Sequence, residues 1–212
     1  MALFATMSMT AGVSPATAGP EQWKIMPLGD SITHGDGSST QSSYRADLWR
    51  ILYPTHPGLD FVGSQQSGQL PDTDHEGHGG WMIDDLRAKT IGWIVAFQPR
   101  TILLHIGTND MDRGPEPEQA PQRLGALLDD IEKAVPGTQV FVATLVPSKK
   151  AAVQERIDRF NAAVPGVVAG RAHVSLVRMD GLDPDLDLRD DLHPNDRGYG
   201  KMASLWGAAL GG

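Results

Sequence analysis

The sequence predicts one α/β domain built on a five-stranded parallel sheet with helices on both faces. Two observations lead to this prediction. Short, strongly apolar runs alternate along the chain with longer stretches whose apolar residues recur at helical spacing. Strands separated by helices in this way pair in parallel through right-handed crossovers, which place helices on both sides of the sheet. A length of 212 residues suits one such domain with a sizeable core.

The expected strands are short apolar runs bounded by residues that interrupt a strand. The first of them stops at Gly29, and the third lies between Pro99 and Gly107. The five runs are, in chain order, Trp23–Leu28, Phe61–Gly63, Thr101–Ile106, Gln139–Val146 and Val174–Met179.

The expected helices are longer stretches in which apolar residues recur every three or four positions. Pro54 closes the first of them, and Pro165 is expected to interrupt the fourth. Gly63–Gly80 is rich in Gly, Ser and Asp and is expected to be irregular, and loops of that length are often functional. The five helices are Ser42–Tyr53, Asp84–Phe97, Glu116–Val135, Ala151–Val164 and Asp196–Leu210.

Composition and charge exclude several classes of function. The chain carries 18 Lys and Arg against 26 Asp and Glu, a formal net charge of −8, so it lacks the basic excess of a nucleic-acid-binding protein. It has no cysteine, which excludes disulfides, zinc–thiolate sites and a cysteine nucleophile. No run approaches 18 apolar residues, so we expect no membrane span. An acidic chain is compatible with a neutral, polar substrate such as a polysaccharide.

Residues 1–20 differ from the rest of the chain and are left out of the fold. They are small and uncharged, and Ala16-Thr17-Ala18 resembles a signal-peptidase site, but no basic residue opens the segment. We expect either a signal peptide with a mis-assigned start, which implies a secreted or extracellular protein, or a disordered tail. The domain is then 21–212.

Residues that directly follow strands are the first candidates for a site, because ligands of parallel sheets bind at the carboxyl ends of the strands. Gly29-Asp30-Ser31 follows the first strand and places Ser31 at that edge, where the N–H groups of the next helix gather. Ser31 is therefore a candidate nucleophile. A helix-capping serine is the alternative that this tripeptide alone leaves open.

Two further segments offer hydrogen-bond donors. Asn109 follows the third strand, and its amide is a neutral donor that suits an oxyanion formed only in the transition state. Gly80 lies in Gly77-His78-Gly79-Gly80-Trp81, where the lack of a side chain lets a backbone N–H approach a ligand. A turn asparagine and a plain flexible loop are the alternatives.

A carboxylate and an imidazole stand three residues apart near the C-terminus, at Asp190 and His193. In a helical turn this spacing brings the two side chains together, so Asp190 could orient His193 as a general base. Pro194 would stand in the first turn of the closing helix. Asp191 is expected to be solvated, and a solvated surface pair is the alternative for the whole group.

Together these segments supply a nucleophile, a base, an orienting carboxylate and oxyanion donors, which are the parts needed for acyl transfer. They resemble the four blocks of SGNH (GDSL-type) hydrolases. The strings MPLGDSITHG, SSYRADLWRIL, FVGSQQSG, DHEGHGGW, IGTNDM and DLHPNDRGYGKMA are similar to those of carbohydrate esterase family 3, the acetylxylan esterases.

The resemblance implies a flavodoxin-like three-layer α/β/α sandwich and the removal of O-acetyl groups from xylan. By position it implies Ser31 as nucleophile, Asp190 orienting His193, and an oxyanion hole formed by the Ser31 N–H with Gly80 and Asn109. The expected partner is an acylated carbohydrate or another small ester. A general short-chain esterase, lysophospholipase or thioesterase is the first alternative, and a catalytically silent carbohydrate-binding module is the second.

We expect no cofactor and no metal in the site. His75-Glu76-Gly77-His78 is one residue short of the zinc motif H-E-x-x-H, and its glycine disfavours a helix. Asp183, Asp185 and Asp187 resemble the start of a calcium loop, but Leu188 replaces the required glycine, so a solvated acidic loop is favoured over structural calcium. His34 and His105 are interpreted as packing or surface residues. Trp81 could stack on a sugar or pack in the core.

Overall fold

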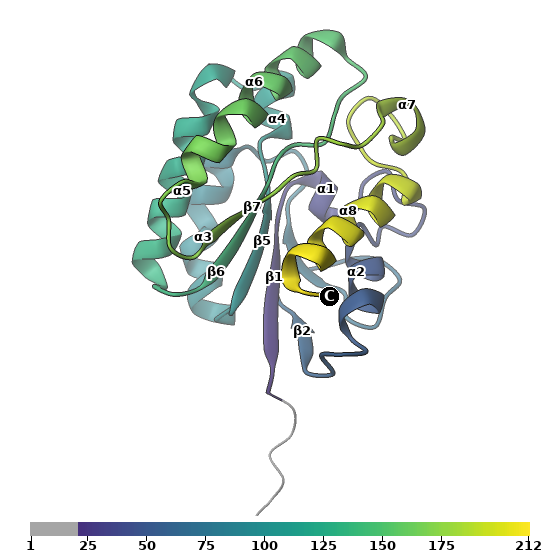
Figure 1. The fold of residues 1–212 in the computed structure, drawn as a ribbon, viewed down its shortest axis with the longest axis vertical. Helices are drawn as coiled ribbons and strands as arrows, with labels where there is room; N and C mark the ends of the chain where they lie inside the picture. The colour runs from purple at the N-terminus through teal and green to yellow at the C-terminus, as the bar shows by residue number, and fades with distance from the viewer. Residues whose placement is uncertain (1–20) are drawn as a thin grey trace, which may run out of the picture.

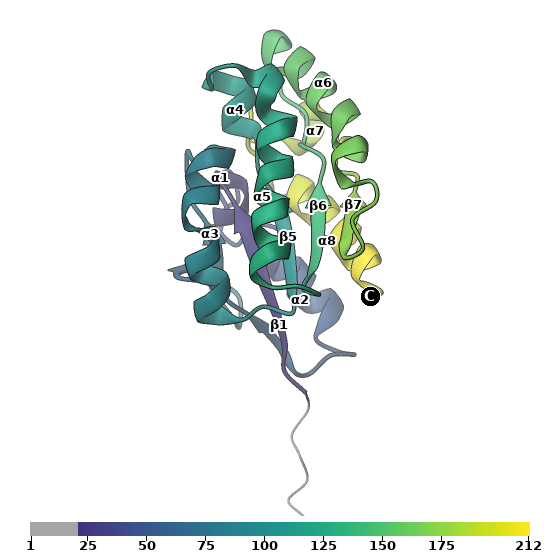
Figure 2. The same ribbon diagram turned by 90° about the vertical axis from the view of Figure 1, so that its left-hand side faces the viewer.

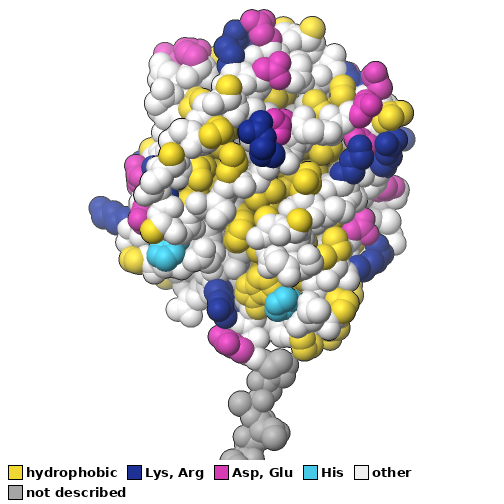
Figure 3. Space-filling model, in the orientation of Figure 1, with side chains coloured by type: hydrophobic (Ala, Val, Ile, Leu, Met, Phe, Trp, Pro, Cys, Tyr) yellow, Lys and Arg dark blue, Asp and Glu magenta, His cyan; other side chains and the backbone are white. Residues whose placement is uncertain are grey.

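The computed structural model describes residues 21–212, so the signal-like or disordered segment predicted over 1–20 lies outside the described residues. Figures 1 and 2 show a central sheet with helices on both faces, as predicted. Among residues 21–212, no helix combines the length and apolar character needed to cross a bilayer. Acidic and basic side chains are interspersed on the face that Figure 3 presents, so the negative net charge forms no single patch there.

All five predicted strands are present and pair in parallel. β1 lies at the centre, between β5 on one side and both β2 and β4 on the other, which pair with its first and last residues respectively. The order is β3-β4-β1-β5-β6-β7, with β2 also beside β1. The strands are β1 Trp23–Gly29, β2 Leu59–Phe61, β3 Gln65–Gln66, β4 Asp74–Gly77, β5 Thr101–His105, β6 Gln139–Ala143 and β7 Val174–Val177.

β3 and β4 form a hairpin inside the segment 63–80, which the sequence predicted to be irregular. That prediction was wrong because these strands lack apolar residues in alternation. β4 is instead held in the sheet by its pairing with β1, where Leu28 is opposite Glu76 and Gly29 is opposite Gly77.

The five predicted helices are present, and four short helical segments join them at the ends of strands and in loops. The helices are α1 Ser31–His34, α2 Arg45–Leu52, α3 Ile83–Phe97, α4 Thr108–Arg113, α5 Ala120–Ala134, α6 Ala151–Val168, α7 Pro184–Asp187 and α8 Asp196–Leu210, with a 3-10 helix at Pro117–Gln119.

Pro165 does not interrupt α6, which continues to Val168. Proline in a helix removes one N–H bond, but here it stands in the last turn. Its own carbonyl still accepts the N–H of Ala169, and Val164 and Val168 on either side are buried in the core. Burial of these two valines offsets the missing bond, so the predicted stop was wrong.

Two hydrophobic cores follow from the alternation of side chains along the strands. Met26 and Leu28 face α3, α5 and α6, whereas Ile25 and Leu103 face α2 and α8. The carboxyl ends of the strands emerge between these two helical layers. The short helices α1 and α4 begin there, directly after β1 and β5.

Arg45, at the start of α2, is fully buried and contacts backbone carbonyls rather than a carboxylate. Burial lowers the pKa of Arg45 to about 10, which leaves the side chain charged at neutral pH. Its N–H groups tie the end of α1 to the loops before α2 and between β3 and β4. The accepting carbonyls are those of Thr33, His34, Gln41, Ser67 and Thr73.

We predict that Arg45→Met lowers the free energy of unfolding by about 3 kcal/mol or more, because several buried carbonyls lose their donors at once. Urea denaturation measures this. The matched control is Arg159→Met, which removes an exposed arginine of α6 and should change stability by about 0.5 kcal/mol or less. Equal effects of the two substitutions would contradict the structural role of Arg45.

Candidate active site

Three of the four predicted segments lie at one edge of the sheet. Ser31 follows β1, Gly80 follows β4 after a short turn, and Asn109 follows β5. β1 pairs in parallel with both β4 and β5, so the carboxyl ends of the three strands coincide. The fourth segment, with Asp190 and His193, lies in the loop between α7 and α8.

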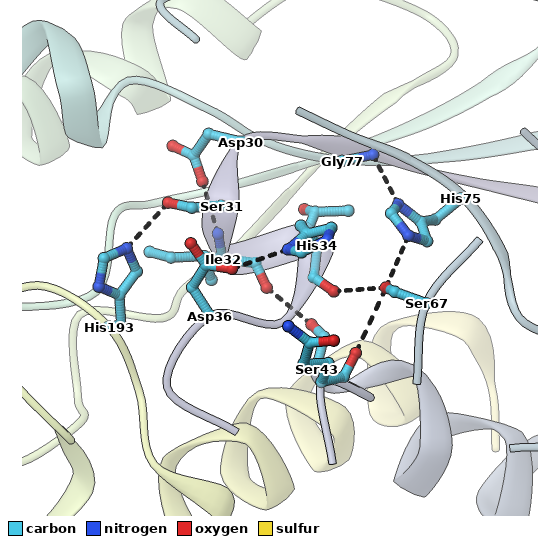
Figure 4. Close-up of polar contacts among 12 residues, drawn as sticks. Asp30, Ser31, Ile32, His34, Asp36, Ser43, Ser67, His75, Gly77 and His193 are labelled. Atoms are coloured by element: carbon cyan, nitrogen blue, oxygen red, sulfur yellow. Dashed lines mark hydrogen bonds and ion pairs between the residues drawn. The ribbon is translucent and has the colours of Figure 1, made fainter. Parts of the chain in front are cut away.

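Ser31, His193 and Asp190 form a continuous hydrogen-bonded row. The Oγ of Ser31 lies 2.9 Å from Nε2 of His193, and Nδ1 of His193 lies 2.9 Å from Oδ2 of Asp190 (Figure 4 shows the first contact). An ionised carboxylate only accepts, so the ring proton lies on Nδ1 and Nε2 is free to accept the Ser31 proton. This is the arrangement that activates a serine for attack on a carbonyl carbon.

The Asp190–His193 segment is not a turn of helix, contrary to the prediction. Oδ1 of Asp190 accepts the backbone N–H groups of Leu192 and His193, both at 2.8 Å, and this local turn preserves the three-residue spacing. Pro194 also lies before α8 rather than in its first turn, since Asn195 caps that helix. Pro194 instead forms a bridge with Leu188 that closes the loop.

The environment of Asp190 keeps it ionised. Burial acts to raise the pKa of Asp190, but the backbone N–H groups of Leu192 and His193 and the imidazole together hold it below its usual value. Asp191 takes no part in this contact, because its carbonyl accepts from Lys149 and Ser148 and its side chain is exposed.

Gly80 occupies a tight turn after β4. The turn is closed by a hydrogen bond from the Trp81 N–H to the His78 carbonyl, and Gly80 has a φ of +82°, which favours glycine. The His78 N–H donates to the Gly29 carbonyl, two residues before Ser31. Within the described chain, the Gly80 N–H has no hydrogen-bond acceptor.

Asn109 has one amide N–H available. Its Nδ2 donates to the Trp81 carbonyl at 2.9 Å, and its Oδ1 accepts from Arg113 at 2.6 Å. One of the two N–H bonds of Nδ2 is therefore free. Ser31 adds its own N–H, which lies at the first residue of α1, where no preceding turn supplies a carbonyl. These are the three N–H groups that the sequence predicts as donors to an oxyanion, and that role remains a prediction.

Two polar residues of this site were not predicted from the sequence. Arg113 contacts both Asn109 and Gly80, and its spacing of four residues from Asn109 would have pointed to a contact had α4 been expected. Asp30 is fully buried, and Oδ1 caps α1 by accepting the Ile32 N–H (Figure 4). Its Oδ2 has no partner in the described chain.

Three further histidines form no hydrogen bond with Ser31 or His193 in the described chain, and neither ring nitrogen of one of them, His105, has a partner there. His75 bonds to the Gly77 N–H and to Ser67 (Figure 4), and burial together with Arg45 lowers its pKa to about 2. His34 pairs with Asp36 at 2.7 Å, and His105 is fully buried, which lowers its pKa to about 4. All three therefore lie apart from the Ser31–His193 contact.

Potential metal ligands are dispersed in the part of the chain that the structure describes, where no three of them form a cluster. His78 bonds to Glu76 and stacks on Trp81, with ring centroids 4.3 Å apart. Asp183 caps α7, and Asp187 pairs with Lys201 and Arg197. The carboxylates of the acidic loop thus serve as a helix cap and as an ion-pair partner.

Comparisons with known proteins identify a matching family and similar structures. A model of the GDSL-like lipase/acylhydrolase family matches residues 28–201. The structure is similar to that of a family 3 carbohydrate esterase from Clostridium thermocellum, with a TM-score of 0.80 and 35% identity over 91% of this chain and 100% of that one. It is also similar to a family 3 carbohydrate esterase from Talaromyces cellulolyticus, with a TM-score of 0.77 and 28% identity over 88% and 95% of the two chains.

A multidomain esterase from Ruminococcus flavefaciens is 28% identical over 233 residues. The match covers 95% of this chain and 30% of the esterase, so the chain spans about a third of that relative's length.

The buried Asp30 predicts a specific pH dependence of stability. Burial raises its pKa from 3.8 to about 7, so the folded state holds this proton more tightly than the unfolded state does. The contribution of Asp30 to stability is then greatest below about pH 4 and falls as the pH rises to about 7.

Asp30→Asn removes this dependence while keeping an oxygen that can cap α1. We expect the free energy of unfolding of the variant, relative to that of the unsubstituted protein, to rise by about 3 kcal/mol from pH 5 to pH 8. This follows from about 1.4 kcal/mol per pKa unit. Urea denaturation at the two pH values measures the change. A stability difference that is the same at both would contradict the prediction.

Proposed function

The chain belongs to the GDSL-like lipase/acylhydrolase family, and on this basis we propose that it is a serine esterase that removes acetyl groups from carbohydrate esters such as acetylated xylan. The observation that carries the proposal is the row from Ser31 through His193 to Asp190, with contacts of 2.9 Å at each step. It combines a nucleophile, a base and an orienting carboxylate in one hydrogen-bonded unit.

In the first half of the reaction, the Ser31 oxygen attacks the acetyl carbonyl carbon while its proton passes to Nε2 of His193. Asp190 stabilises the imidazolium that results. The tetrahedral intermediate then collapses, the bond to the sugar oxygen breaks, and His193 returns the proton to that oxygen. The sugar leaves as an alcohol and the acetyl group remains on Ser31 as an ester.

In the second half, water attacks the acetyl-Ser31 carbonyl and gives its proton to His193. The intermediate collapses, Ser31 recovers the proton, and the acetyl group leaves as acetic acid, which releases its remaining proton to solvent and becomes acetate. Both halves pass through a negatively charged oxygen, which the N–H groups of Ser31 and Gly80 and the free N–H of Asn109 would stabilise. Such donors act mainly in the transition state, so they accelerate the chemical step.

Two observations support a carbohydrate substrate. The solved structures with 35% and 28% identity are family 3 carbohydrate esterases. The side chains of His193 and Asp190 are also open to solvent, with 22% and 54% of their surface exposed. His193 protonates the leaving group, so the sugar would lie on this open side, where a polymer has room to extend.

We predict that Ser31→Ala abolishes ester hydrolysis and leaves the fold intact, because the Ser31 hydroxyl bonds to no side chain other than His193 in the described chain. Turnover of 4-nitrophenyl acetate and the melting temperature measure the two effects. The control Ser204→Ala, on the exposed side of α8, should keep full activity. Retained function in Ser31→Ala would favour a catalytically silent binding module.

We predict that acetate release from acetylated xylan and peracetylated xylose has a higher kcat/KM than hydrolysis of octanoyl esters. The reason is that the proposed leaving group is a sugar and the acyl group is small. A panel of acetyl, butyryl and octanoyl esters with one thioester measures the preference. Equal or higher activity on the long acyl chains would indicate a general esterase or lysophospholipase, and a preference for the thioester would indicate a thioesterase.

A further inference from the structure

We propose that Arg113 is a positioning residue of the oxyanion hole, which fixes the amide of Asn109 and the turn at Gly80 in one arrangement. This inference rests on the proposed esterase function. Arg113 is the last residue of α4, and its guanidinium reaches two acceptors. Nη1 lies 2.6 Å from Oδ1 of Asn109, and Nη2 lies 2.7 Å from the carbonyl oxygen of Gly80.

The contact with Asn109 decides which end of the amide is available to a substrate. A guanidinium only donates, so it selects the oxygen of the amide, and the Trp81 carbonyl only accepts, so it selects the nitrogen. A flipped amide would place its N–H groups against Arg113 and its oxygen against another oxygen. Arg113 and Trp81 together therefore present an N–H, rather than a carbonyl oxygen, at the free side of Asn109.

The contact with Gly80 fixes the second donor segment relative to the first. Gly80 lies in a left-handed conformation in the turn after β4, and Asn109 lies in α4 after β5. These segments are 29 positions apart in the chain, from 80 to 109, and the Arg113 side chain bridges them directly. Planar, charge-assisted donors of this kind give geometric precision as well as attraction.

Loss of Arg113 should leave the fold in place, because other contacts join the same segments. Asp110 accepts the Ile83 N–H and pairs with Arg123, and Asn109 still donates to the Trp81 carbonyl. Arg113 itself is exposed. The expected consequence of its removal is a freer Asn109 amide and a looser Gly80 turn, and not unfolding.

The test is a double-mutant cycle on kcat and KM with 4-nitrophenyl acetate. The variants are Arg113→Ala, Arg113→Lys, Asn109→Ala and Asn109→Ala with Arg113→Ala. The matched control is Arg159→Ala, which removes an exposed arginine of α6 that pairs, among residues 21–212, only with Glu155 of the same helix, and it should behave like the unsubstituted protein. Melting temperatures are measured for every variant.

We expect Arg113→Ala to lower kcat about 10- to 100-fold with KM changed by less than about twofold, since misplacement of a catalytic group costs up to about 100-fold. The kcat of Arg113→Lys should lie between those of the unsubstituted protein and Arg113→Ala, because a single ammonium cannot hold both acceptors in the same plane. Asn109→Ala should lower kcat by about 10²- to 10³-fold. In the Asn109→Ala variant, the added Arg113→Ala substitution should lower kcat only a few-fold further, because only its contact with Gly80 remains to be lost.

Three results would overturn the proposal. An unchanged kcat in Arg113→Ala would show that the contacts of Arg113 with Asn109 and Gly80 are not needed. A raised KM with unchanged kcat would indicate substrate binding by Arg113 itself, and a full effect retained in the Asn109→Ala background would show that Arg113 acts independently of Asn109. If Arg113→Ala does not fold, the same criteria apply to Arg113→Lys.

Failure of the proposed function gives a different result. If the unsubstituted protein hydrolyses none of the esters in the panel, or if Ser31→Ala is as active as the unsubstituted protein, the esterase assignment fails whatever Arg113 does. If the esterase activity depends on Ser31 but not on Arg113, only the inference about Arg113 fails.

Discussion

The close approach of three backbone segments at Gly29 and Gly77 is the constraint on which the rest of the site depends. Gly29 of β1 lies in register with Gly77 of β4 on one side and with His105 of β5 on the other. A Cβ on Gly29 would lie 2.2 Å from the His105 carbonyl oxygen, and one on Gly77 would lie 2.4 Å from the His34 nitrogen. Only a chain without side chains here lets α1 fold against the edge of the sheet, which places Ser31 between the two donor segments.

Two buried ionisable groups flank α1, and they differ in how far hydrogen bonds compensate for their burial. Asp30 precedes the helix, one of its oxygens has no partner among residues 21–212, and burial raises its pKa to about 7. Arg45 binds the other end of α1 and compensates for its burial with several carbonyl acceptors. The unsatisfied group thus lies next to Ser31 and the satisfied one lies away from it. Local conflicts of this kind concentrate at functional sites, where the surrounding fold must supply the stability that they cost.

The parts of the fold that could be predicted from sequence were those in which the residue pattern within one segment is enough to indicate its structure or role. The apolar run of β1 and the spacing of Asp190 and His193 are of this kind, although the three-residue spacing fits a capped turn as well as the helical turn that was expected. The β3–β4 hairpin has no apolar alternation and depends on the pairing of β4 with β1, so its own sequence does not predict it. The contacts of Arg45, and that of Arg113 with Gly80, are made to backbone carbonyls of distant segments, and every residue has a carbonyl, so no pattern of residue types marks them.

The two sides of the site are built in different ways, and this difference bears on the substrate. Ser31 and Asn109 lie on short helices that follow strands, Gly80 lies in the turn after β4, and Ser31 itself is only 7% exposed. His193 comes from a loop that is stiffened by one carboxylate and is open to solvent. In the proposed reaction the acyl carbonyl would lie against the side that carries the donors, where the oxyanion would form, and the leaving group would lie toward His193, from which its oxygen would receive the proton. A site rigid toward the acyl group and open toward the alcohol can accept alcohols of many sizes, which is what an ester carried on a polymer requires.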